Sequence, residues 1–564
     1  MSEAQREPSA SALPLVVRNL RVGFGGTEVV RGISFEVRAG ECLAIVGESG
    51  SGKSVTARSL LGLAGPGASA DADELAIGGR SVLGLSEAAW RKRRGRDVGL
   101  VLQDALVSLD PLRPIGREIA DSLRLHTHLS AAERADTVQE LLVSVGLPGG
   151  EWRVRQRSGD LSGGQRQRAL IASAIALNPP LLIADEPTTA LDVTVQAQIL
   201  DLLADIRARG TAIVLISHDL SVVSRIADRV AVMSDGRIIE TGSTDQVLGL
   251  PAHPETERMI AAVPSGKPRG TALSSPSGRS QLAVLDRRVS ERAVPNRTVP
   301  GQSSGVVVLE ASGLSKSFPR PGGAPVLAVD DVSFHLDEGT TLGIVGESGS
   351  GKTTIARLVL ALARPDRGEV KLLGQPWTVL SEKDRRRLRP ALGAIYQDAL
   401  SSFDPRFTVG RILRDAVAGP DPARSSRGQR TTAARVGELI DSVGLSSDVL
   451  GRRAVDMSGG QRQRVGIARA LASRPSILVC DEPVSSLDVA VQAQVLDLLD
   501  ELQRELRLSL LFISHDLGVI QHVSDQVAVM KDGHIVEQGT ADELFRHPTH
   551  PYTRRLLGAV ARLP

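Results

Sequence analysis

Short runs of consecutive apolar residues, separated by polar stretches, mark the most strongly buried segments of this chain. Four of these runs, at residues 42–46, 181–184, 342–345 and 477–480, contain mostly aliphatic side chains. They are too short for buried helices, so they predict strands that are covered on both faces. Helical patterns lie between the runs, and this alternation predicts an α/β fold with a mostly parallel sheet.

The pattern occurs twice along the chain. Lys53 and Lys352 are separated by 299 positions, and three further pairs of matching residues are separated by 294 to 297 positions. Such a nearly constant offset indicates a duplicated domain. Each copy ends in a hairpin pattern, with an Asp-Gly turn at positions 235–236 in the first copy and 532–533 in the second.

These copies define the predicted domain organisation. The first copy covers residues 13–264 and the second covers residues 306–545. Residues 1–12 are expected to be a disordered N-terminus, and residues 546–564 form a C-terminal tail. Residues 265–305 are rich in Ser, Pro, Gly and Arg, which predicts a flexible linker.

Composition narrows the class of protein. A chain of 564 residues is too long for a single core, and a net charge of +2 argues against a nucleic-acid binder with a broad basic surface. Cys42 and Cys480 lie in apolar runs, so we expect buried thiols in a reducing compartment. No apolar run approaches 18 residues and the N-terminus lacks a secretory signal pattern, so any membrane role is expected to require a partner.

A phosphate-binding loop is the first candidate for chemistry. GESGSGKS in the first copy and GESGSGKT in the second fit the pattern G-x-x-x-x-G-K-[ST], and each follows a predicted strand. Successive backbone N–H groups of such a loop surround phosphate oxygens, and the following helix adds its positive dipole end. Lys53 and Lys352 would reach the β- and γ-phosphates, while the hydroxyl groups of Ser54 and Thr353 would bind Mg²⁺.

Two of the predicted strands end in pairs of carboxylates. Asp185 and Glu186 follow one strand, and Asp481 and Glu482 follow its counterpart. Ligands of α/β folds bind at the carboxyl ends of strands. The first carboxylate could hold the Mg²⁺ shell and the second could polarise the water that attacks the γ-phosphate. Taken alone, a strand that runs into a polar turn would explain each pair equally well.

A second anion site is predicted in each copy. LSGGQRQR and MSGGQRQR each lead into a helical stretch, with Ser162 and Ser458 at the start. A hydroxyl group and bare N–H groups at the start of a helix favour bound anions. A lone Ser-Gly-Gly would be only a loop, but the repeated Gln-Arg-Gln-Arg tail makes the signal specific.

Together these motifs resemble the ATPases of the ABC-transporter family. The resemblance also includes Gln103 and Gln397, the segments DEPTTALD and DEPVSSLD, and two ISHDL segments, in the family's order. It covers nearly the whole chain apart from the linker and the N-terminus. It implies two tandem P-loop NTPase domains, here called cassettes, each with a mostly parallel core sheet, an antiparallel β subdomain and a helical subdomain.

The resemblance also implies a head-to-tail pair, in which the P-loop of one cassette and the SGGQ signature of the other hold one ATP. The implied catalytic residues are Glu186, Glu482, His218 and His515. The implied ATP-contacting residues are Phe24, Gly47, Ser49, Gly50, Gly52, Lys53, Ser54, Gln103, Ser162, Gly163, Gly164, Gln165, Asp192, Phe318, Gly346, Ser348, Gly349, Gly351, Lys352, Thr353, Gln397, Ser458, Gly459, Gly460, Gln461 and Asp488. The implied Mg²⁺ ligands are Ser54, Gln103, Asp185, Thr353, Gln397 and Asp481. Phe24 and Phe318 stand where the family usually has a tyrosine that stacks on adenine, although either could be a core residue.

Local segments resemble the peptide and nickel importers within the family. These segments are VLQDALVSLDP, IYQDALSSFDP, LDVTVQAQIL, LDVAVQAQVL and the tail RHPTHPYTRRLL. The first cassette keeps a degraded tail, PAHPETERMI, without the tyrosine. Some relatives hold an iron–sulfur centre after this tail, but the two cysteines of this chain lie elsewhere and cannot form one.

The resemblance therefore implies a fused double ATPase that energises an importer, with ATP and Mg²⁺ as cofactors. Its expected partners are two transmembrane permease subunits and an extracytoplasmic solute-binding protein, with no nucleic acid and no direct contact with the cargo. We expect it at the cytoplasmic face of the membrane, attached through the permeases. Dipeptides, longer peptides, glutathione and nickel chelates all remain open as cargo.

Two other classes of double-cassette protein fit the sequence less well. A soluble double-cassette ABC ATPase that acts on ribosomes or DNA would typically have a long charged helical linker or zinc-binding cysteines, and this chain has a short turn-rich linker and no such cysteines. A fused sugar-importer ATPase usually has one degenerate site, whereas both sets of motifs are intact here.

Overall fold

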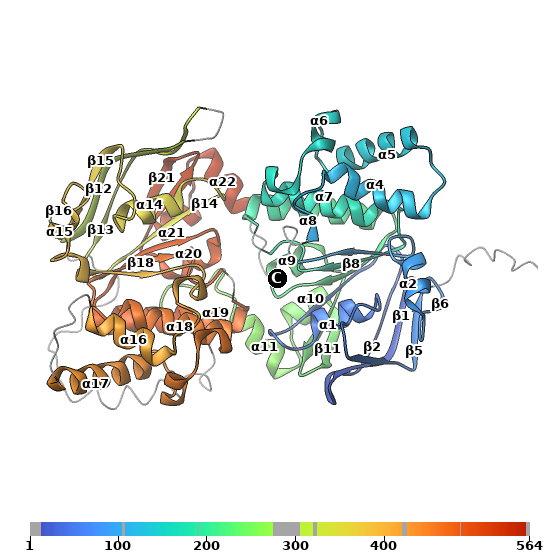
Figure 1. Cartoon of the computed structure of the whole chain (residues 1–564), viewed down its shortest axis with the longest axis horizontal. Coiled ribbons are helices and arrows are strands. Elements are labelled where there is room, and N and C mark those ends of the chain that lie inside the picture. The colour runs from blue at the N-terminus through green and yellow to red at the C-terminus, as the bar shows by residue number, and fades with distance from the viewer. Residues whose placement is uncertain are drawn as a thin grey trace, which may run out of the picture. The chain divides into compact units, whose positions relative to one another are not determined.

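The structure, a computed structural model, describes residues 13–103, 108–189, 191–274, 305–319, 324–419, 426–485 and 487–559. The chain forms two compact units, the first extending to Ile260 and the second beginning at Ala261. In each unit a large sheet carries helices and is joined by a smaller antiparallel sheet (Figure 1). The predicted α/β fold class is therefore confirmed. The expected N-terminus of residues 1–12 and most of the expected linker lie outside the described residues.

The core sheet of the first unit has six strands in the order β11-β10-β3-β9-β8-β7. These strands are β3 (Cys42–Val46), β7 (Val98–Val101), β8 (Leu181–Asp185), β9 (Ala212–Ile216), β10 (Arg229–Ser234) and β11 (Arg237–Ser243). All pairs in it are parallel except the β10–β11 hairpin. Every residue of β3, β8 and β9 is buried, as expected for strands covered on both faces.

The second sheet of the first unit is antiparallel. Its strands are β1 (Leu15–Phe24), β2 (Thr27–Val37), β4 (Ala68–Asp71), β5 (Glu74–Ile77) and β6 (Arg80–Ser81). Apolar side chains such as Leu15, Val17 and Ile33 join side chains of the core sheet and Trp90 in one hydrophobic cluster. The antiparallel β subdomain implied by the family resemblance is thus present.

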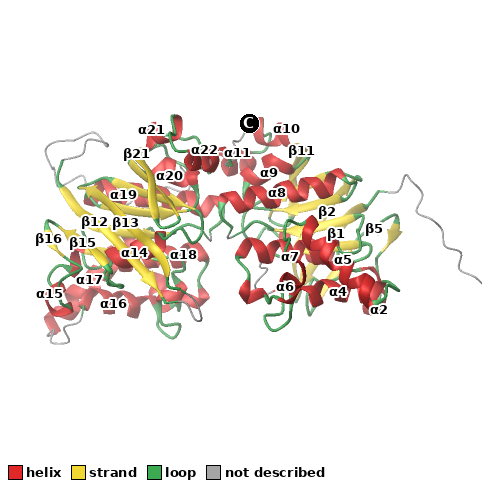
Figure 2. Cartoon of the chain, turned by 90° about the horizontal axis from the view of Figure 1, so that it is seen from above, coloured by secondary structure: helices red, strands yellow, loops and turns green. Residues whose placement is uncertain are grey.

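Helices cover both sides of the first unit's core sheet. They are α1 (Lys53–Ser59), α2 (Glu87–Arg93), α4 (Ile115–His126), α5 (Ala131–Ser144), α6 (Gly150–Arg155), α7 (Gly163–Ile175), α8 (Val193–Ala208), α9 (Leu220–Ile226), α10 (Thr244–Gly249) and α11 (Pro254–Ala261). Helix α4 contacts α5, α6 and α7, which together form the expected helical subdomain. In Figure 2, α10 lies on one side of the strands, and α4 and α5 lie on the other.

The second unit repeats this architecture. Its core sheet has the order β17-β18-β19-β14-β20-β21 and its antiparallel sheet has the order β13-β12-β15-β16. The strands are β12 (Val307–Phe318), β13 (Val326–Asp337), β14 (Thr341–Gly346), β15 (Arg367–Leu372), β16 (Gln375–Pro376), β17 (Leu392–Ile395), β18 (Ile477–Asp481), β19 (Ser509–Ser514), β20 (Gln526–Lys531) and β21 (His534–Thr540). The helices are α14 (Lys352–Val359), α15 (Glu382–Arg385), α16 (Val409–Ala418), α17 (Ser426–Ser442), α18 (Gly459–Ala470), α19 (Val489–Leu506), α20 (Leu517–Val523), α21 (Ala541–Arg546) and α22 (Pro551–Gly558).

Both hairpins predicted from the Asp-Gly pairs are confirmed. Asp235 and Gly236 connect β10 to β11 with φ angles of 44° and 76°, and Asp532 and Gly533 connect β20 to β21 with φ angles of 47° and 85°. Two successive residues with positive φ form the turn that matches the twist of two-residue hairpins.

The beginning of the expected linker has defined contacts. Residues 261–274 belong to the second compact unit, and Ala262 and Leu273 are buried in its hydrophobic cluster. The second unit therefore starts well before residue 306, where the sequence places the second cassette. Composition suggests a tether at residues 265–274 because Ser, Pro, Gly and Arg are typical of tethers, but this part of the chain buries the apolar side chain of Leu273.

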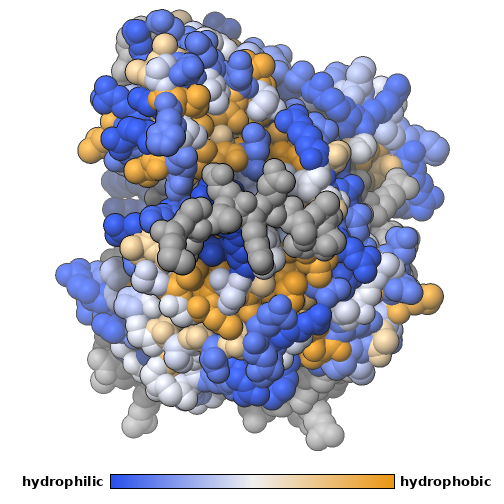
Figure 3. All heavy atoms as spheres, turned by 90° about the vertical axis from the view of Figure 1, so that its right-hand side faces the viewer, coloured by the Kyte–Doolittle hydropathy of each residue, from blue (hydrophilic) through white to orange (hydrophobic). Residues whose placement is uncertain are grey.

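Among the residues that the structure describes, no helix has the length and hydropathy to cross a bilayer. Figure 3 shows one face on which hydrophilic residues alternate with smaller apolar areas. Cys42 and Cys480 are both fully buried free thiols, as predicted, and burial raises the pKa of each thiol to about 12.

Candidate functional site

The two GESGSGK loops connect a core strand to a helix in each unit. Gly52 precedes α1 with a φ angle of 101°, a left-handed conformation that glycine adopts without strain. The Lys53 Nζ atom donates to the carbonyl oxygens of Gly47 at 2.8 Å and Glu48 at 2.7 Å. The lysine thus folds back over its own loop, and its ammonium group lies among the loop's backbone atoms.

The loop of the second unit has the same geometry. Gly351 precedes α14 with a φ angle of 104°. The Lys352 Nζ atom donates to the carbonyl oxygens of Gly346 at 2.7 Å and Glu347 at 2.8 Å. The agreement between the units shows that the repeated sequence gives the same local conformation in both.

A hydroxyl group and a carboxylate meet beside each loop. The Ser54 hydroxyl donates to Asp185 at 3.1 Å, and the Thr353 hydroxyl donates to Asp481 at 3.3 Å. Burial is the main reason why the pKa of both aspartates is raised, and the neighbouring glutamate raises each further. A carboxylate beside a hydroxyl oxygen offers the oxygen ligands that Mg²⁺ prefers, so these residues fit the expected metal.

The second carboxylate of each pair lies at the centre of a hydrogen-bonded group. Glu186 accepts from the Gln103 Nε2 atom at 2.7 Å and from the Thr189 hydroxyl at 3.0 Å, and it lies 3.1 Å from the His218 Nδ1 atom. Its φ angle is +49°, an uncommon conformation for a residue with a side chain. The structure therefore brings together three predicted site residues, Glu186, Gln103 and His218, at the carboxyl end of β8.

Burial and mutual attraction have opposing effects on the pKa values of Glu186 and His218. Burial works to raise the pKa of Glu186 and to lower the pKa of His218. Their mutual hydrogen bond and attraction outweigh burial, so the pKa of the glutamate is lowered and that of the histidine is raised. The geometry thus favours an ionised carboxylate, which is the form needed to accept a proton from water.

The second unit has the equivalent group. Glu482 accepts from the Gln397 Nε2 atom at 3.0 Å and lies 3.1 Å from the His515 Nδ1 atom. Its pKa is lowered and that of His515 is raised, with burial again opposing their mutual attraction. Ser485 donates to the backbone oxygen of Glu482, whereas the equivalent Thr189 donates to the carboxylate of Glu186. Sequence analysis did not assign Thr189 or Ser485 a role; their position three residues after the glutamate is the signal that could have indicated one.

The signature segments begin helices, as predicted. Ser162 and Ser458 are the N-caps of α7 and α18, and each forms a capping box with the glutamine three residues later. The second glycine of each signature lies against a valine on a neighbouring helix. A Cβ atom added to Gly164 would meet Val195 at 2.3 Å, and one added to Gly460 would meet Val491 at 2.4 Å.

Asp192 and Asp488, and the two phenylalanines, also have defined positions. Asp192 and Asp488 cap α8 and α19 by accepting from backbone N–H groups at 2.9 Å. Phe24 and Phe318 lie at the ends of β1 and β12, and Phe24 packs partly against the hydrophobic core. Adenine stacking by these rings therefore stays a prediction.

Comparison with known proteins gives the decisive observation. The model of the ABC transporter family matches residues 30–189 and 329–485, and that of the oligopeptide/dipeptide transporter C-terminal region matches residues 536–564. The peptidoglycan transport ATP-binding protein YejF of Agrobacterium fabrum is 40% identical over 99% of this chain and 97% of its own length. The chain belongs to the ABC-transporter ATPase family. The predicted family and ATPase activity are confirmed.

Two relatives named for glutathione import give the same result. The glutathione import ATP-binding protein GsiA of Shigella flexneri is 41% identical over 97% of this chain and 89% of its own length, and GsiA of Salmonella typhimurium is 42% identical over the same shares. A solved, dimeric ATP-binding cassette bound to ADP and Pi is 26% identical over 41% of this chain and 98% of its own, with a TM-score of 0.38.

The C-terminal tail adds a contact that sequence analysis did not assign to the ABC ATPase site. Tyr552, in the first turn of α22, is buried, and its hydroxyl oxygen accepts from the backbone N–H of Glu347 in the P-loop at 3.2 Å. The tail is held in place by Glu537, which accepts from the N–H groups of Thr549 and His550. These hydrogen bonds help to lower the pKa of Glu537 to about 2, against the opposing effect of burial. The tyrosine is present in the second tail and absent from the first, and this difference in the sequence could have indicated the contact.

Proposed function

We propose that this ABC ATPase is the energy-coupling subunit of an importer for peptides or a related small solute. The observation that carries the proposal is the pair of complete groups around Glu186 and Glu482, each beside a P-loop lysine. The match to the oligopeptide/dipeptide transporter C-terminal region supports peptide-type cargo. The relatives named for glutathione import and peptidoglycan transport keep glutathione and peptide-containing fragments among the candidates.

In the proposed mechanism, each P-loop lysine neutralises the β- and γ-phosphates, and the carboxylates of Glu186 and Glu482 accept a proton from the attacking water. His218 and His515 hold these carboxylates in position and keep them ionised, and Gln103 orients Glu186 through a hydrogen bond. Bound Mg²⁺ would lie at Ser54 and Asp185, or at Thr353 and Asp481, and would supply charge neutralisation of the phosphates.

The proposal includes a head-to-tail pair of cassettes, with Ser458 completing the site of Lys53 and Ser162 completing the site of Lys352. ATP would then bridge the cassettes, and loss of the γ-phosphate would let them open. Ser49 is exposed in the first P-loop, and Ser458 is exposed at the second signature. In a Glu186→Gln/Glu482→Gln background, the pair Ser49→Cys and Ser458→Cys should crosslink with ATP and not without it. A crosslink that is independent of ATP, or none at all, contradicts the pairing.

The expected partners are two permeases and an extracytoplasmic binding protein, with the ATPase at the cytoplasmic face of the membrane. Affinity purification from solubilised membranes should recover integral membrane permeases together with this chain. Recovery of ribosomes without permeases would favour the soluble double-cassette alternative. Uptake of labelled peptides and glutathione, compared between the parent and Glu186→Gln/Glu482→Gln cells, would then identify the cargo class.

A further inference from the structure

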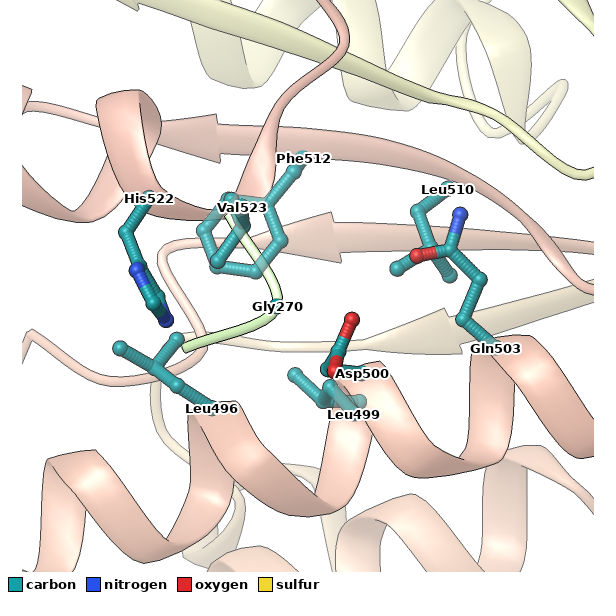
Figure 4. A pocket seen from close by; sticks show the side chains of 9 residues that line it. All are labelled: Gly270, Leu496, Leu499, Asp500, Gln503, Leu510, Phe512, His522 and Val523. Atoms are coloured by element: carbon teal, nitrogen blue, oxygen red, sulfur yellow. The ribbon is translucent and has the colours of Figure 1, made fainter. Parts of the chain in front are cut away.

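The face formed by α19 and α20 of the second cassette is occupied by the segment that follows the first cassette. This segment, residues 265–274, is here called the strap. Figure 4 shows Gly270 of the strap beside apolar side chains of both helices and of β19. The lining residues include Leu496, Leu499, Phe512 and Val523. The strap thus covers apolar surface that would otherwise face water.

Polar contacts fix the strap to the same face. Arg269 forms an ion pair with Asp525 and donates to the Gln503 Oε1 atom at 2.8 Å. Asp497 on α19 accepts from the N–H of Leu273 at 3.0 Å, and from both the N–H at 2.8 Å and the hydroxyl at 2.5 Å of Ser274. Because a carboxylate holds these backbone N–H groups, the strap has a defined position, unlike a mobile tether.

The strap also touches one side of α20. Ser265 lies against Gly518, where an added Cβ atom would be 2.2 Å from the serine hydroxyl oxygen. The N–H of Gly266 donates to the Gln521 Oε1 atom at 3.4 Å, and the carbonyl oxygen of Lys267 lies 3.4 Å from the Nδ1 atom of His522. The three contacted residues of α20 are spaced i, i+3 and i+4, so they lie on one face of the helix.

The first cassette fills the equivalent positions with its own side chains. Its Asp228, equivalent to Asp525, pairs with Arg207 of α8 at 3.0 Å, and that arginine stands where the second cassette has Gln503. The second cassette therefore obtains from the strap the guanidinium group that the first cassette has on its own helix.

Two further differences make room for the strap. Asp201, equivalent to Asp497, pairs with Arg225 at 2.9 Å, and the second cassette has the smaller His522 at that arginine's position. Where the first cassette has Ser221, the second has Gly518, against which Ser265 lies. The two cassettes thus differ at three separate positions, and each difference lets this face of the second cassette accept the strap.

Helix α20 connects this face to the ATPase site. It begins at Leu517, directly after Asp516, which caps the helix, and His515, which holds Glu482. We propose that the strap braces α20 and so fixes the position of His515, which gives the second ATP site a control by the inter-cassette segment. This inference rests on the proposed function, because it assigns His515 to an ATP site.

The test uses the full chain with Glu186→Gln, so that turnover reports the second site. A release variant, Arg269→Ala/Asp497→Ala, removes both charged anchors of the strap. A companion variant adds Gln503→Arg, which restores an arginine for Asp525 as in the first cassette while the strap stays released. Asp201→Ala is the matched control, because it removes the equivalent carboxylate of α8 in the first cassette.

Hydrogen exchange and ATP turnover are measured on the same samples. In the parent, residues 265–274 and α20 should exchange slowly, and in the release and companion variants both should exchange faster. The kcat of the second site should fall about three- to tenfold, the range expected for residues that act through an intervening helix, with the KM for ATP little changed. Asp201→Ala should change neither measurement at the second site.

Rapid exchange of residues 265–274 in the parent would overturn the strap itself. Release of the strap with unchanged kcat, or with unchanged exchange in α20, would overturn its link to His515. A loss of kcat that the companion variant fully restores would show that only the charge of Asp525 matters, and would also overturn the proposal. If the parent and all variants lack turnover while α20 still responds to release, the proposed function fails and the brace stands.

Discussion

In the first cassette the His218 Nδ1 atom lies 3.1 Å from Glu186, and in the second the His515 Nδ1 atom lies 3.1 Å from Glu482. The two cassettes differ away from these groups. The backbone N–H of Glu347 in the second P-loop donates to the Tyr552 hydroxyl oxygen, whereas the first tail has Glu255 at the equivalent position. This difference shows that the duplicated chain preserves the groups expected to hydrolyse ATP and varies the segments that hold them.

The largest expected effect concerns the two glutamates. Glu186→Gln or Glu482→Gln should lower ATP turnover at the affected site by about 10²- to 10⁴-fold, because a general base contributes a factor of that size. Steady-state turnover of each single variant and of the double variant measures whether the two sites contribute equally. Normal turnover in the double variant would show that these carboxylates are not the bases.

The next effect concerns the signature glycines. Gly460→Ala should destabilise the second cassette by about 1–3 kcal/mol, because the new methyl group would overlap Val491. Alanine is otherwise the better helix former, so a loss of stability would report the steric contact. Urea unfolding of Gly460→Ala and of Gly460→Ala/Val491→Ala measures it, with recovery expected in the double variant. Gly164→Ala with Val195→Ala is the matched pair in the first cassette, and a different response there would break the equivalence of the two signatures.

A smaller effect distinguishes the two tails. Tyr552→Phe removes only the hydroxyl group that binds the Glu347 N–H, a hydrogen bond worth about 0.5–1.5 kcal/mol. We therefore expect ATP to bind the second site a few times more weakly, measured by titration in the Glu186→Gln/Glu482→Gln background. Glu255→Gln in the first tail should leave ATP binding unchanged. Equal binding by Tyr552→Phe and the parent would mean that the tail does not support the loop.

The smallest effect concerns pH. The pKa of Glu482 is lowered and that of His515 is raised, so their ion pair stabilises the fold between these two pKa values. The stabilisation is lost as pH falls through the lowered pKa of the glutamate or rises through the raised pKa of the histidine. Glu482→Gln should therefore lower the melting temperature most near pH 6 and least in alkaline buffer. A difference that stays constant from pH 6 to pH 9 would contradict the charge assignment.

Sequence patterns were sufficient where the signal is local. The buried runs at β3 and β18, the Asp-Gly hairpins and the helix starts at Ser162 and Ser458 depend on neighbours a few positions away, and all are present in the structure. The residues around Glu186 could be named because the family motifs mark them. Their hydrogen-bond partners come from separate strands and helices, so the distances had to come from the structure.

The strap could not be predicted in the same way. Its composition is that of a tether. Its contacts depend on Gln503 and Gly518, which lie more than 200 positions after the strap in the sequence. Neither residue is unusual by itself. The structure places them at the positions of Arg207 and Ser221 in the first cassette. This equivalence shows that the face formed by α19 and α20 is complementary to the strap.

The fully buried thiols of Cys42 and Cys480 have a practical consequence. Because their pKa is about 12, almost no thiolate forms near neutral pH, and the side chains are closed to reagents in the folded chain. Fluorophores or spin labels could therefore be attached at newly introduced cysteines while both native ones are retained. Domain movements during the transport cycle could then be followed spectroscopically in an otherwise unaltered protein.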